Sequence, residues 1–217
     1  MSRFHKNYLA RSIDLININT LGTPIHIIGC GSVGSAVAVQ LAKMGFGNMH
    51  LYDFDIVEDV NIGCQRHTVD DIGSNKATAS KVAVYLASGF GVQTHEQGYT
   101  DQPLNGIVIS AVDVMAVRKS IFENAPIGTM IIDPRMAATQ FDLVTCLKGA
   151  DDKLYESTLF TDEDSIHTPC TMKSTMFCAD ILAGMCSFEV FKFTTDKSVD
   201  KRIIWDGESN SLTNLYG

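Results

Sequence analysis

A glycine-rich segment near the start of the chain has the spacing of a phosphate-binding turn. The segment Gly29-Cys-Gly31-Ser-Val-Gly34 follows a short apolar run and precedes a helical pattern. In such a turn the first glycine permits the tight bend, the second lets the backbone approach a phosphate, and the third lets the helix pack on the strand. The start of the helix then offers free N–H groups to an anion. A nucleotide site is expected here, and the alternative is a glycine turn without a ligand.

Two charged residues downstream suit the same site. Asp53 lies nineteen residues beyond Gly34, close to the distance of about 20 at which an acidic side chain meets a ribose hydroxyl. Lys76 is expected to begin a helix, where a cation is unfavourable against the helix dipole, and this misfit favours a functional reason for it. The glycines and Asp53 suit a nicotinamide cofactor as well as ATP, so they do not choose between the two.

A longer series of motifs does separate them. It comprises Gly45-Phe-Gly47, Asp53-Phe-Asp55-Ile-Val-Glu58, Asn61 with Gln65, Ile72-Gly-Ser-Asn-Lys76, Val112-Asp113 with Arg118 five residues on, and Arg135-Met136. With the glycine segment, this series resembles the ThiF/MoeB-type activating enzymes, which are adenylyltransferases related to ubiquitin-activating enzymes, over about residues 20–193. The resemblance implies an adenylyltransferase that uses ATP and magnesium. Its substrate would be the C-terminal glycine carboxylate of a ubiquitin-like protein, a sulfur-carrier protein or a peptide.

The resemblance also implies roles for the matched side chains. Lys76 would bind the phosphates, Asp53 the ribose and Asp113 the magnesium ion. The implied ATP-binding set is Gly29, Gly31, Gly34, Asp53, Asp55, Asn61, Gln65 and Lys76. From the residues alone, Asp55 could instead be a solvated loop acid, and Asp113 could be the N-cap of the next helix.

Several arginines are candidates because a carboxylate that attacks an α-phosphate needs cations around it. The family commonly has Arg-Gln after the asparagine, whereas this chain has Cys64-Gln65-Arg66, so Arg66 could serve from a shifted position. Arg118 and Arg135 match family arginines that could contact substrate or phosphate, although Arg118 could equally be a surface helix residue. Arg11 is the candidate for the arginine that many family members send into the partner subunit's site.

Among six cysteines, Cys170 is the candidate nucleophile. It precedes a predicted long helix, at a position resembling the cysteine on which some family members carry the activated carrier as a thioester or acyl disulfide. A helix N-terminus lowers a thiol pKa; the alternative is a small apolar residue in a turn. The sequence has no Cys-x-x-Cys pair, so no structural zinc is expected. Asp113, Arg66 and Cys170 are thus the expected catalytic residues.

Strand and helix patterns alternate along the chain. Strands are expected at 25–28, 50–53, 92–95, 106–110, 129–133 and 141–147, and helices at 33–43, 76–87, 114–124 and 174–193. This alternation predicts an α/β, Rossmann-like fold. Its sheet would be mostly parallel with helices on both faces, and its C-terminal part would carry antiparallel strands and the long helix.

Composition bounds the remaining possibilities. The chain has 217 residues with 45% hydrophobic residues, which indicates one globular domain over 1–217. A net charge of -8 argues against a nucleic-acid-coating protein. No apolar run reaches the roughly 18 residues of a membrane span, and the start lacks a signal-peptide core, so a cytoplasmic protein is expected. A homodimer is expected from the resemblance, and because a single small domain lacks other surface with which to complete the site.

Two other interpretations stay open. A nicotinamide-dependent oxidoreductase would share the glycine turn and Asp53, but it does not explain Asp55, Asn61, Gln65 and Lys76 together, and no Tyr-x-x-x-Lys pair is present. A non-catalytic subunit of a heterodimeric activating enzyme would explain the shifted Arg66. The retained Lys76 and Asp113 argue against it.

Overall fold

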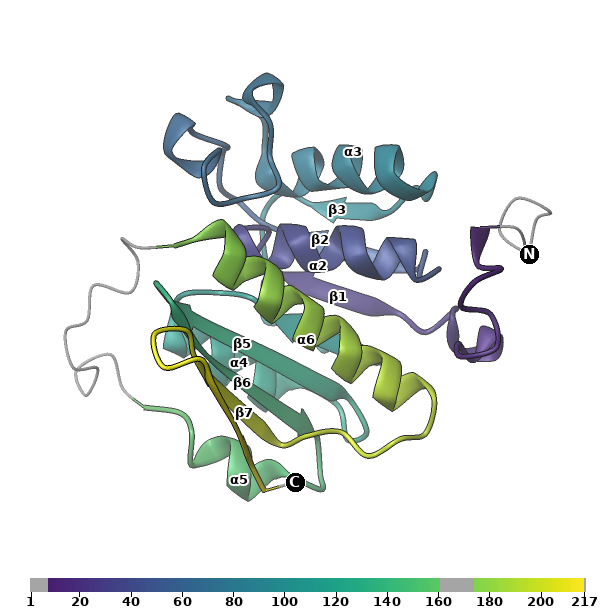
Figure 1. The fold of residues 1–217 in the computed structure, drawn as a ribbon, viewed down its shortest axis with the longest axis vertical. Helices are drawn as coiled ribbons and strands as arrows, with labels where there is room; N and C mark the ends of the chain where they lie inside the picture. Colours follow the sequence, from purple (N-terminus) through teal and green to yellow (C-terminus); the bar gives the residue numbers. More distant parts are fainter. Residues whose placement is uncertain (1–7, 161–173, 217) are drawn as a thin grey trace.

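One mixed β-sheet organises the molecule (Figure 1). The computed structural model describes residues 8–160 and 174–216. The parallel strands are β1 (Ile25–Ile28), β2 (Met49–Tyr52), β3 (Gln93–His95), β4 (Ile107–Ser110) and β5 (Met130–Ala137). The antiparallel strands β6 (Gln140–Leu147), β7 (Arg202–Asp206) and β8 (Ser211–Leu215) extend the sheet beyond β5. The strand order is β3-β2-β1-β4-β5-β6-β7-β8. Strands β2 and β3 lie on one side of β1 and β4 lies on the other, so the strand order reverses between β1 and β4. Ligands of such sheets bind beside the carboxyl ends of the strands at this switch point.

Helices cover both faces of the sheet. On one face α2 (Ser32–Lys43) lies between α3 (Lys76–Ser88) and the long α6 (Met176–Thr194), and all three contribute side chains to the largest core cluster. On the other face lie α4 (Met115–Asn124) and the short α5 (Asp152–Glu156), whose Phe122 and Tyr155 rings pack together. Figure 1 shows α6 in front of the sheet and α4 behind it. Short 3-10 turns occupy Ile18–Thr20, Asp59–Asn61 and Val69–Asp71.

Local sequence explains where these elements begin and end. All four residues of β1 are buried, because a parallel strand at the centre of a sheet is covered on both sides. The N-cap of helix α3 is Asn75, whose side-chain oxygen accepts hydrogen bonds from the N–H groups of Ala77 and Thr78. The helix ends at Gly89, which has the left-handed backbone conformation that glycine adopts without strain.

The predicted fold class is confirmed, including the helices on both faces and the antiparallel strands after β5. Each predicted strand and helix is present, with shifted ends; β5 continues to Ala137, past the predicted end at 133. The sequence patterns missed α5, β7 and β8. Strand β8 is exposed along nearly all of its length, so it lacks the buried face that produces an apolar pattern. No helix in the described part of the chain combines the length and apolarity needed to cross a membrane.

Candidate functional site

The glycine turn between β1 and α2 is packed so tightly that two of its positions exclude a side chain. A Cβ on Gly29, which has φ +89°, would lie 2.3 Å from the carbonyl oxygen of Ala111, just after β4. A Cβ on Gly34 would lie 1.9 Å from the carbonyl oxygen of Gly29. At Gly31 an added Cβ would have one neighbour within 4 Å among the described residues, Nε2 of Gln65 at 3.9 Å. The first and third glycines therefore serve the protein's own packing, whereas the described residues leave space in front of Gly31.

Asp53 holds this turn against the end of β2. Its carboxylate is nearly buried and accepts two backbone hydrogen bonds, from Cys30 N–H to Oδ2 at 2.6 Å and from Asp55 N–H to Oδ1 at 2.8 Å. Burial raises the pKa of Asp53, and the two N–H groups and Lys76 oppose that rise. Each carboxylate oxygen can accept a second hydrogen bond. The geometry thus leaves acceptor capacity for a ribose hydroxyl at the position that the sequence predicted.

Lys76 lies at the start of α3, close to the same turn. Its ammonium Nζ is 2.9 Å from Asp55 Oδ2, and its backbone N–H donates to the carbonyl of Asp55. Its charge also lowers the pKa of the Cys30 thiol inside the glycine turn, where burial has the larger, opposite effect. Asn61 has a local role in this structure, because its Oδ1 accepts the Glu58 N–H and closes the 3-10 turn at Asp59–Asn61.

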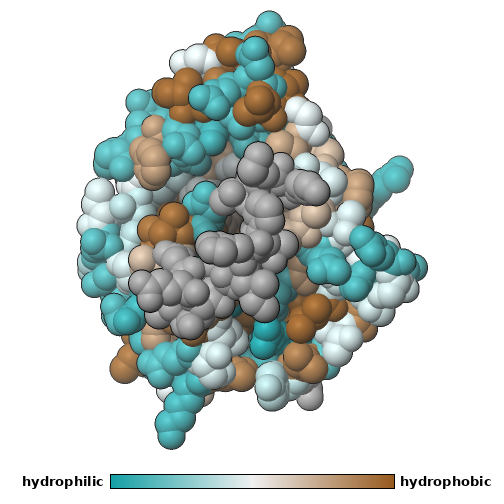
Figure 2. Space-filling model, turned by 90° about the vertical axis from the view of Figure 1, so that its left-hand side faces the viewer, coloured by the Kyte–Doolittle hydropathy of each residue, from teal (hydrophilic) through white to brown (hydrophobic). Residues whose placement is uncertain are grey.

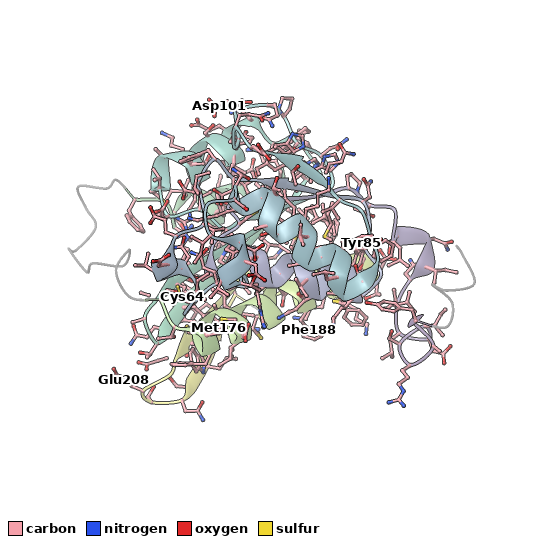
Figure 3. The ribbon with its side chains drawn as sticks, turned by 90° about the horizontal axis from the view of Figure 1, so that it is seen from above. Cys64, Tyr85, Asp101, Met176, Phe188 and Glu208 are labelled. Atoms are coloured by element: carbon pink, nitrogen blue, oxygen red, sulfur yellow. The ribbon has the colours of Figure 1, made fainter. Side chains whose placement is uncertain are left out.

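Gln65 and Arg66 point in different directions. The Gln65 amide faces the open side of Gly31, and its buried Oε1 has no hydrogen-bond partner in the part of the chain that is described. Arg66 instead places Nη2 2.5 Å from Oδ1 of Asp180 on α6. Figure 3 shows neighbouring Cys64 and the first residue of α6, Met176, at the same end of the molecule. The structure therefore pairs Arg66 with α6, while Gln65 borders the turn.

Asp113 is exposed in the segment that joins β4 to α4. The N-cap of α4 is Val114, and no side chain in the described part of the chain caps this helix. The interpretation of Asp113 as a helix cap is therefore wrong. Asp113 comes two residues after Ala111, whose carbonyl contacts the glycine turn, so its carboxylate lies at the switch-point edge of the sheet.

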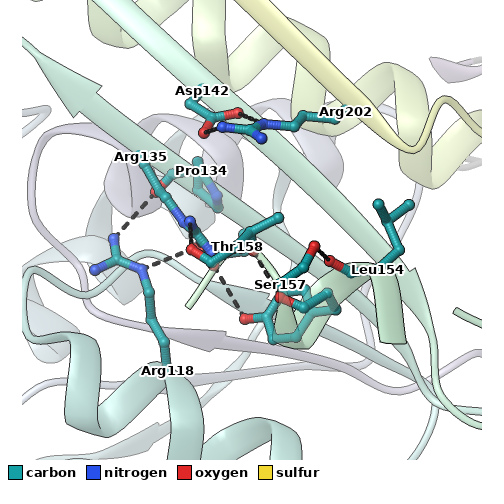
Figure 4. A network of polar contacts seen from close by, with 10 residues as sticks. Arg118, Pro134, Arg135, Asp142, Leu154, Ser157, Thr158 and Arg202 are labelled. Atoms are coloured by element: carbon teal, nitrogen blue, oxygen red, sulfur yellow. Dashed lines mark hydrogen bonds and ion pairs between the residues drawn. The ribbon is translucent and has the colours of Figure 1, made fainter. Parts of the chain in front are cut away.

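Arg118 and Arg135 converge on Asp133, whose side chain is fully buried. Figure 4 shows the two arginines within this network of polar contacts. Arg118 Nε donates to Asp133 Oδ1 at 2.8 Å, and Arg135 Nη2 donates to Oδ2 at 2.7 Å. The Tyr155 hydroxyl donates to Oδ2 at 3.0 Å, and Arg135 Nη1 donates to the Thr158 carbonyl at 2.7 Å. Arg118 is only 6% exposed, so the surface-residue interpretation is wrong. Both arginines are engaged within the fold.

Two of the predicted site residues are not seen at this site. Arg11 is exposed, in the N-terminal segment at the end of the sheet opposite the glycine turn (Figure 1). Cys170 lies outside the described residues. Cys30, Cys146, Cys178 and Cys186 are buried. Within the described ranges, no group of three or more His, Cys, Asp or Glu side chains is arranged to hold a metal ion.

The sequence reasoning missed His67. Its side chain is buried, and its Nε2 lies 3.0 Å from the carbonyl oxygen of Cys30. The signal was weak: a histidine two residues after Gln65, on a loop already expected to border the phosphates.

The switch-point edge thus gathers the glycine turn, Asp53, Gln65, Lys76 and Asp113. Figure 2 looks onto this end of the molecule. The segment between β2 and α3 forms its upper part, with apolar Phe54, Val60 and Val69 exposed among polar residues.

Comparison with known proteins identifies the family. The model of the ThiF family matches residues 19–215. The chain belongs to the ThiF family. The resemblance to activating enzymes inferred from the motifs is confirmed.

Sequence relatives match a limited part of the chain. The Nedd8-activating enzyme E1 catalytic subunit of Drosophila melanogaster is 38% identical over 77 residues, which is 34% of this chain and 17% of that protein. Ubiquitin-like modifier-activating enzyme 5 of Oryza sativa subsp. japonica is 36% identical over 76 residues, 35% of this chain and 17% of that protein. The matches span about a sixth of the length of these two curated relatives.

Solved structures share the fold over nearly the whole chain. PaaA superposes with a TM-score of 0.79 at 19% identity, covering 99% of this chain and 74% of that one. MccB of E. coli, solved with ATP, has a TM-score of 0.76 at 18% identity, covering 99% of this chain and 72% of that one.

Proposed function

We propose that this chain is an ATP-dependent adenylyltransferase that activates a C-terminal carboxylate. The observation that carries the proposal is the open side of Gly31, bordered by the Gln65 amide, with Asp53 and Lys76 beside the same turn. The N-cap of α2 is Gly31, and among the described residues no side chain caps this helix. Its first N–H groups are therefore available to an anion, and the helix dipole favours negative charge there.

The residues suit transfer of an adenylyl group. An acceptor carboxylate oxygen would attack the α-phosphorus of ATP, forming an acyl adenylate and releasing pyrophosphate. Negative charge builds up on the phosphates during this step, and preorganised cations and N–H groups stabilise it. Lys76 and the start of α2 supply such groups. Asp53 would fix the ribose and thereby orient the α-phosphate.

Magnesium would be held by Asp113. A single exposed carboxylate fits this ion, which proteins usually bind through one or two carboxylates together with substrate phosphates. When bound, magnesium would neutralise phosphate charge. The protein's part is to place one carboxylate beside the glycine turn, at the end of β4.

The proposed acceptor is a ubiquitin-like or sulfur-carrier protein, or a peptide, that ends in glycine. The support is that sequence relatives are named as ubiquitin-like modifier-activating enzymes and that MccB has been solved together with MccA. We also propose a homodimer. The N-terminal segment that carries Arg11 lies at the opposite end of the sheet from the glycine turn, so a second copy would be needed to bring an arginine from this segment to the site.

Ligand-dependent stability provides the first test. At a hundredfold excess over its dissociation constant, ATP with magnesium should stabilise the fold by about 2.7 kcal/mol. NAD should give no shift in a thermal melt. A larger shift with NAD than with ATP would favour an oxidoreductase and overturn the proposal.

Exchange of pyrophosphate into ATP tests catalysis, once an acceptor is supplied. Asp113→Ala should lower the exchange rate several-hundredfold, since one such electrostatic contact contributes about 3–4 kcal/mol. The matched control is Glu123→Ala, which removes an exposed carboxylate at the other end of α4. Normal exchange in the Asp113 variant would refute its assignment. ATP binding without exchange with any acceptor would favour a non-catalytic subunit.

Cys170 would act after the adenylate has formed, by taking the acyl group onto its sulfur and releasing AMP. Cys170→Ala should therefore keep pyrophosphate exchange and lose any reducible covalent conjugate, as seen on gels with and without thiol. A conjugate that persists in this variant would exclude Cys170 as the carrier residue.

A further inference from the structure

His67 contacts the glycine turn from the side of the loop that precedes α3. Its imidazole is only 4% exposed, and Nε2 lies 3.0 Å from the Cys30 carbonyl oxygen. A carbonyl oxygen can only accept, so Nε2 must be the donor. The other ring nitrogen, Nδ1, is buried without a hydrogen-bond partner among the described residues. Among the described residues the ring therefore has one hydrogen bond, and it is with the backbone of the glycine turn.

The Cys30 residue is held from both sides. Its N–H donates to Asp53 Oδ2, and its carbonyl accepts from His67. The peptide bond that links Cys30 to Gly31 is trans, so its carbonyl and the Gly31 N–H point in opposite directions. By holding the carbonyl on one side, His67 fixes the Gly31 N–H towards the other.

The Gly31 N–H is one of the turn's groups that have no partner among the described residues. The described residues provide no acceptor for it, while the Gly31 carbonyl accepts from the Ser35 N–H. Gln65 Nε2 is the one described atom within 4 Å of a Cβ built on Gly31, at 3.9 Å, so the described residues do not crowd this position. A backbone N–H of fixed direction beside an open space suits a phosphate oxygen.

We propose that His67 is a positioning residue that aims the Gly31 N–H at a phosphate of the bound nucleotide. The proposal rests on the function proposed above, and it adds a residue that does not itself touch the nucleotide. Burial lowers the pKa of His67, against the raising effects of its hydrogen bond to Cys30 and of Asp71 and Asp53; Lys76 lowers it further. A neutral ring donating from Nε2 has an unprotonated Nδ1, which is consistent with the lack of an acceptor there.

A pair of substitutions separates the hydrogen bond from the volume of the ring. A glutamine side chain can place its Nε2 near the position of the imidazole Nε2, whereas the shorter asparagine cannot. His67→Asn and His67→Ala should therefore raise the Kd for ATP–magnesium about tenfold, the effect of one lost hydrogen bond. His67→Gln should restore affinity to within about threefold of the wild type. The control is His26→Gln, which changes a buried histidine that contacts Tyr52 and not the turn.

Two readouts decide the outcome. Calorimetric titration with ATP–magnesium is run on variants whose melting shows that they are folded. Equal affinity of His67→Asn and the wild type, or equal losses in the Gln and Asn variants, would overturn the proposal. If the variants do not fold, NMR of the wild type with labelled histidine still decides: the Nε2–H tautomer of His67 is expected, and the Nδ1–H tautomer would refute the contact. A wild type that does not bind ATP refutes the proposed function, and the tautomer then reports on the contact separately.

Discussion

Replacing Gly34 by alanine should destabilise the fold far more than an ordinary helix substitution. The new Cβ would lie 1.9 Å from the carbonyl oxygen and 3.0 Å from the carbonyl carbon of Gly29, and 3.3 Å from Ile27 Cγ2. The two nearest atoms belong to the Gly29 backbone, so rotation of a side chain cannot relieve the clash. Gly29 cannot retreat easily, because its own Cα faces the Ala111 carbonyl. Helix α2 would have to lift off β1.

The size of this effect can be bounded. Overpacking a core typically costs about 1–3 kcal/mol, and a clash with fixed backbone belongs at or above the upper end, at about 3 kcal/mol or more. With a urea m-value of about 1–3 kcal/mol/M, the unfolding midpoint should fall by about 1 M or more. Urea titration followed by far-UV circular dichroism measures this shift. ATP-dependent stabilisation should be lost as well, since the turn would be displaced.

Gly184 in the middle of α6 provides the matched control. It is exposed, and beyond the neighbouring backbone of its own helix no described atom lies within 4 Å of the Cβ that an alanine would add. Gly184→Ala should therefore stabilise the protein by about 0.5–1 kcal/mol through helix propensity alone. The same exchange in two helices should thus have opposite signs. A cost below 1 kcal/mol for Gly34→Ala would refute the described packing of α2 against the turn.

Two further predictions concern buried polar groups. Asp133→Asn should lower the free energy of unfolding by about 3–5 kcal/mol, because it leaves buried Arg118 without its ionised partner. Tyr155→Phe removes one hydrogen bond to the same carboxylate and should lower it by about 1.5–3 kcal/mol. A larger loss for Tyr155→Phe than for Asp133→Asn in urea titration would contradict the network. Acid should destabilise the fold through His26. Burial and neighbouring His50 lower the pKa of His26 from 6.5 to about 4, so the unfolded chain binds the proton more readily than the folded one. Up to about 3 kcal/mol of the free energy of unfolding is therefore lost as the pH falls from 6.5 to about 4. Urea midpoints at pH 7 and 5 should therefore differ less in His26→Gln than in the wild type, and equal differences would exclude His26 as the source.

Much of the candidate site could be predicted from the sequence because its signals are local. The turn between β1 and α2 needs glycines at fixed spacing, and a buried parallel strand must be a continuous apolar run. The carboxyl ends of parallel strands lie at the same edge of the sheet. Asp53 and Asp113 each follow such a strand, so both could be expected beside the turn. The carry-over of roles from the family to individual residues stays a prediction.

Only the tertiary structure decided which polar groups are engaged within the fold. Arg118 belongs to a helix with exposed neighbours, and nothing near it in sequence reveals that it is buried against Asp133, fifteen residues away. Arg66 pairs with Asp180, 114 residues on, and His67 reaches Cys30 across 37 residues. Local sequence reports the conformations a segment prefers. Hydrogen bonds between distant segments depend on which segments become neighbours in the folded chain. The packing of the whole core determines this.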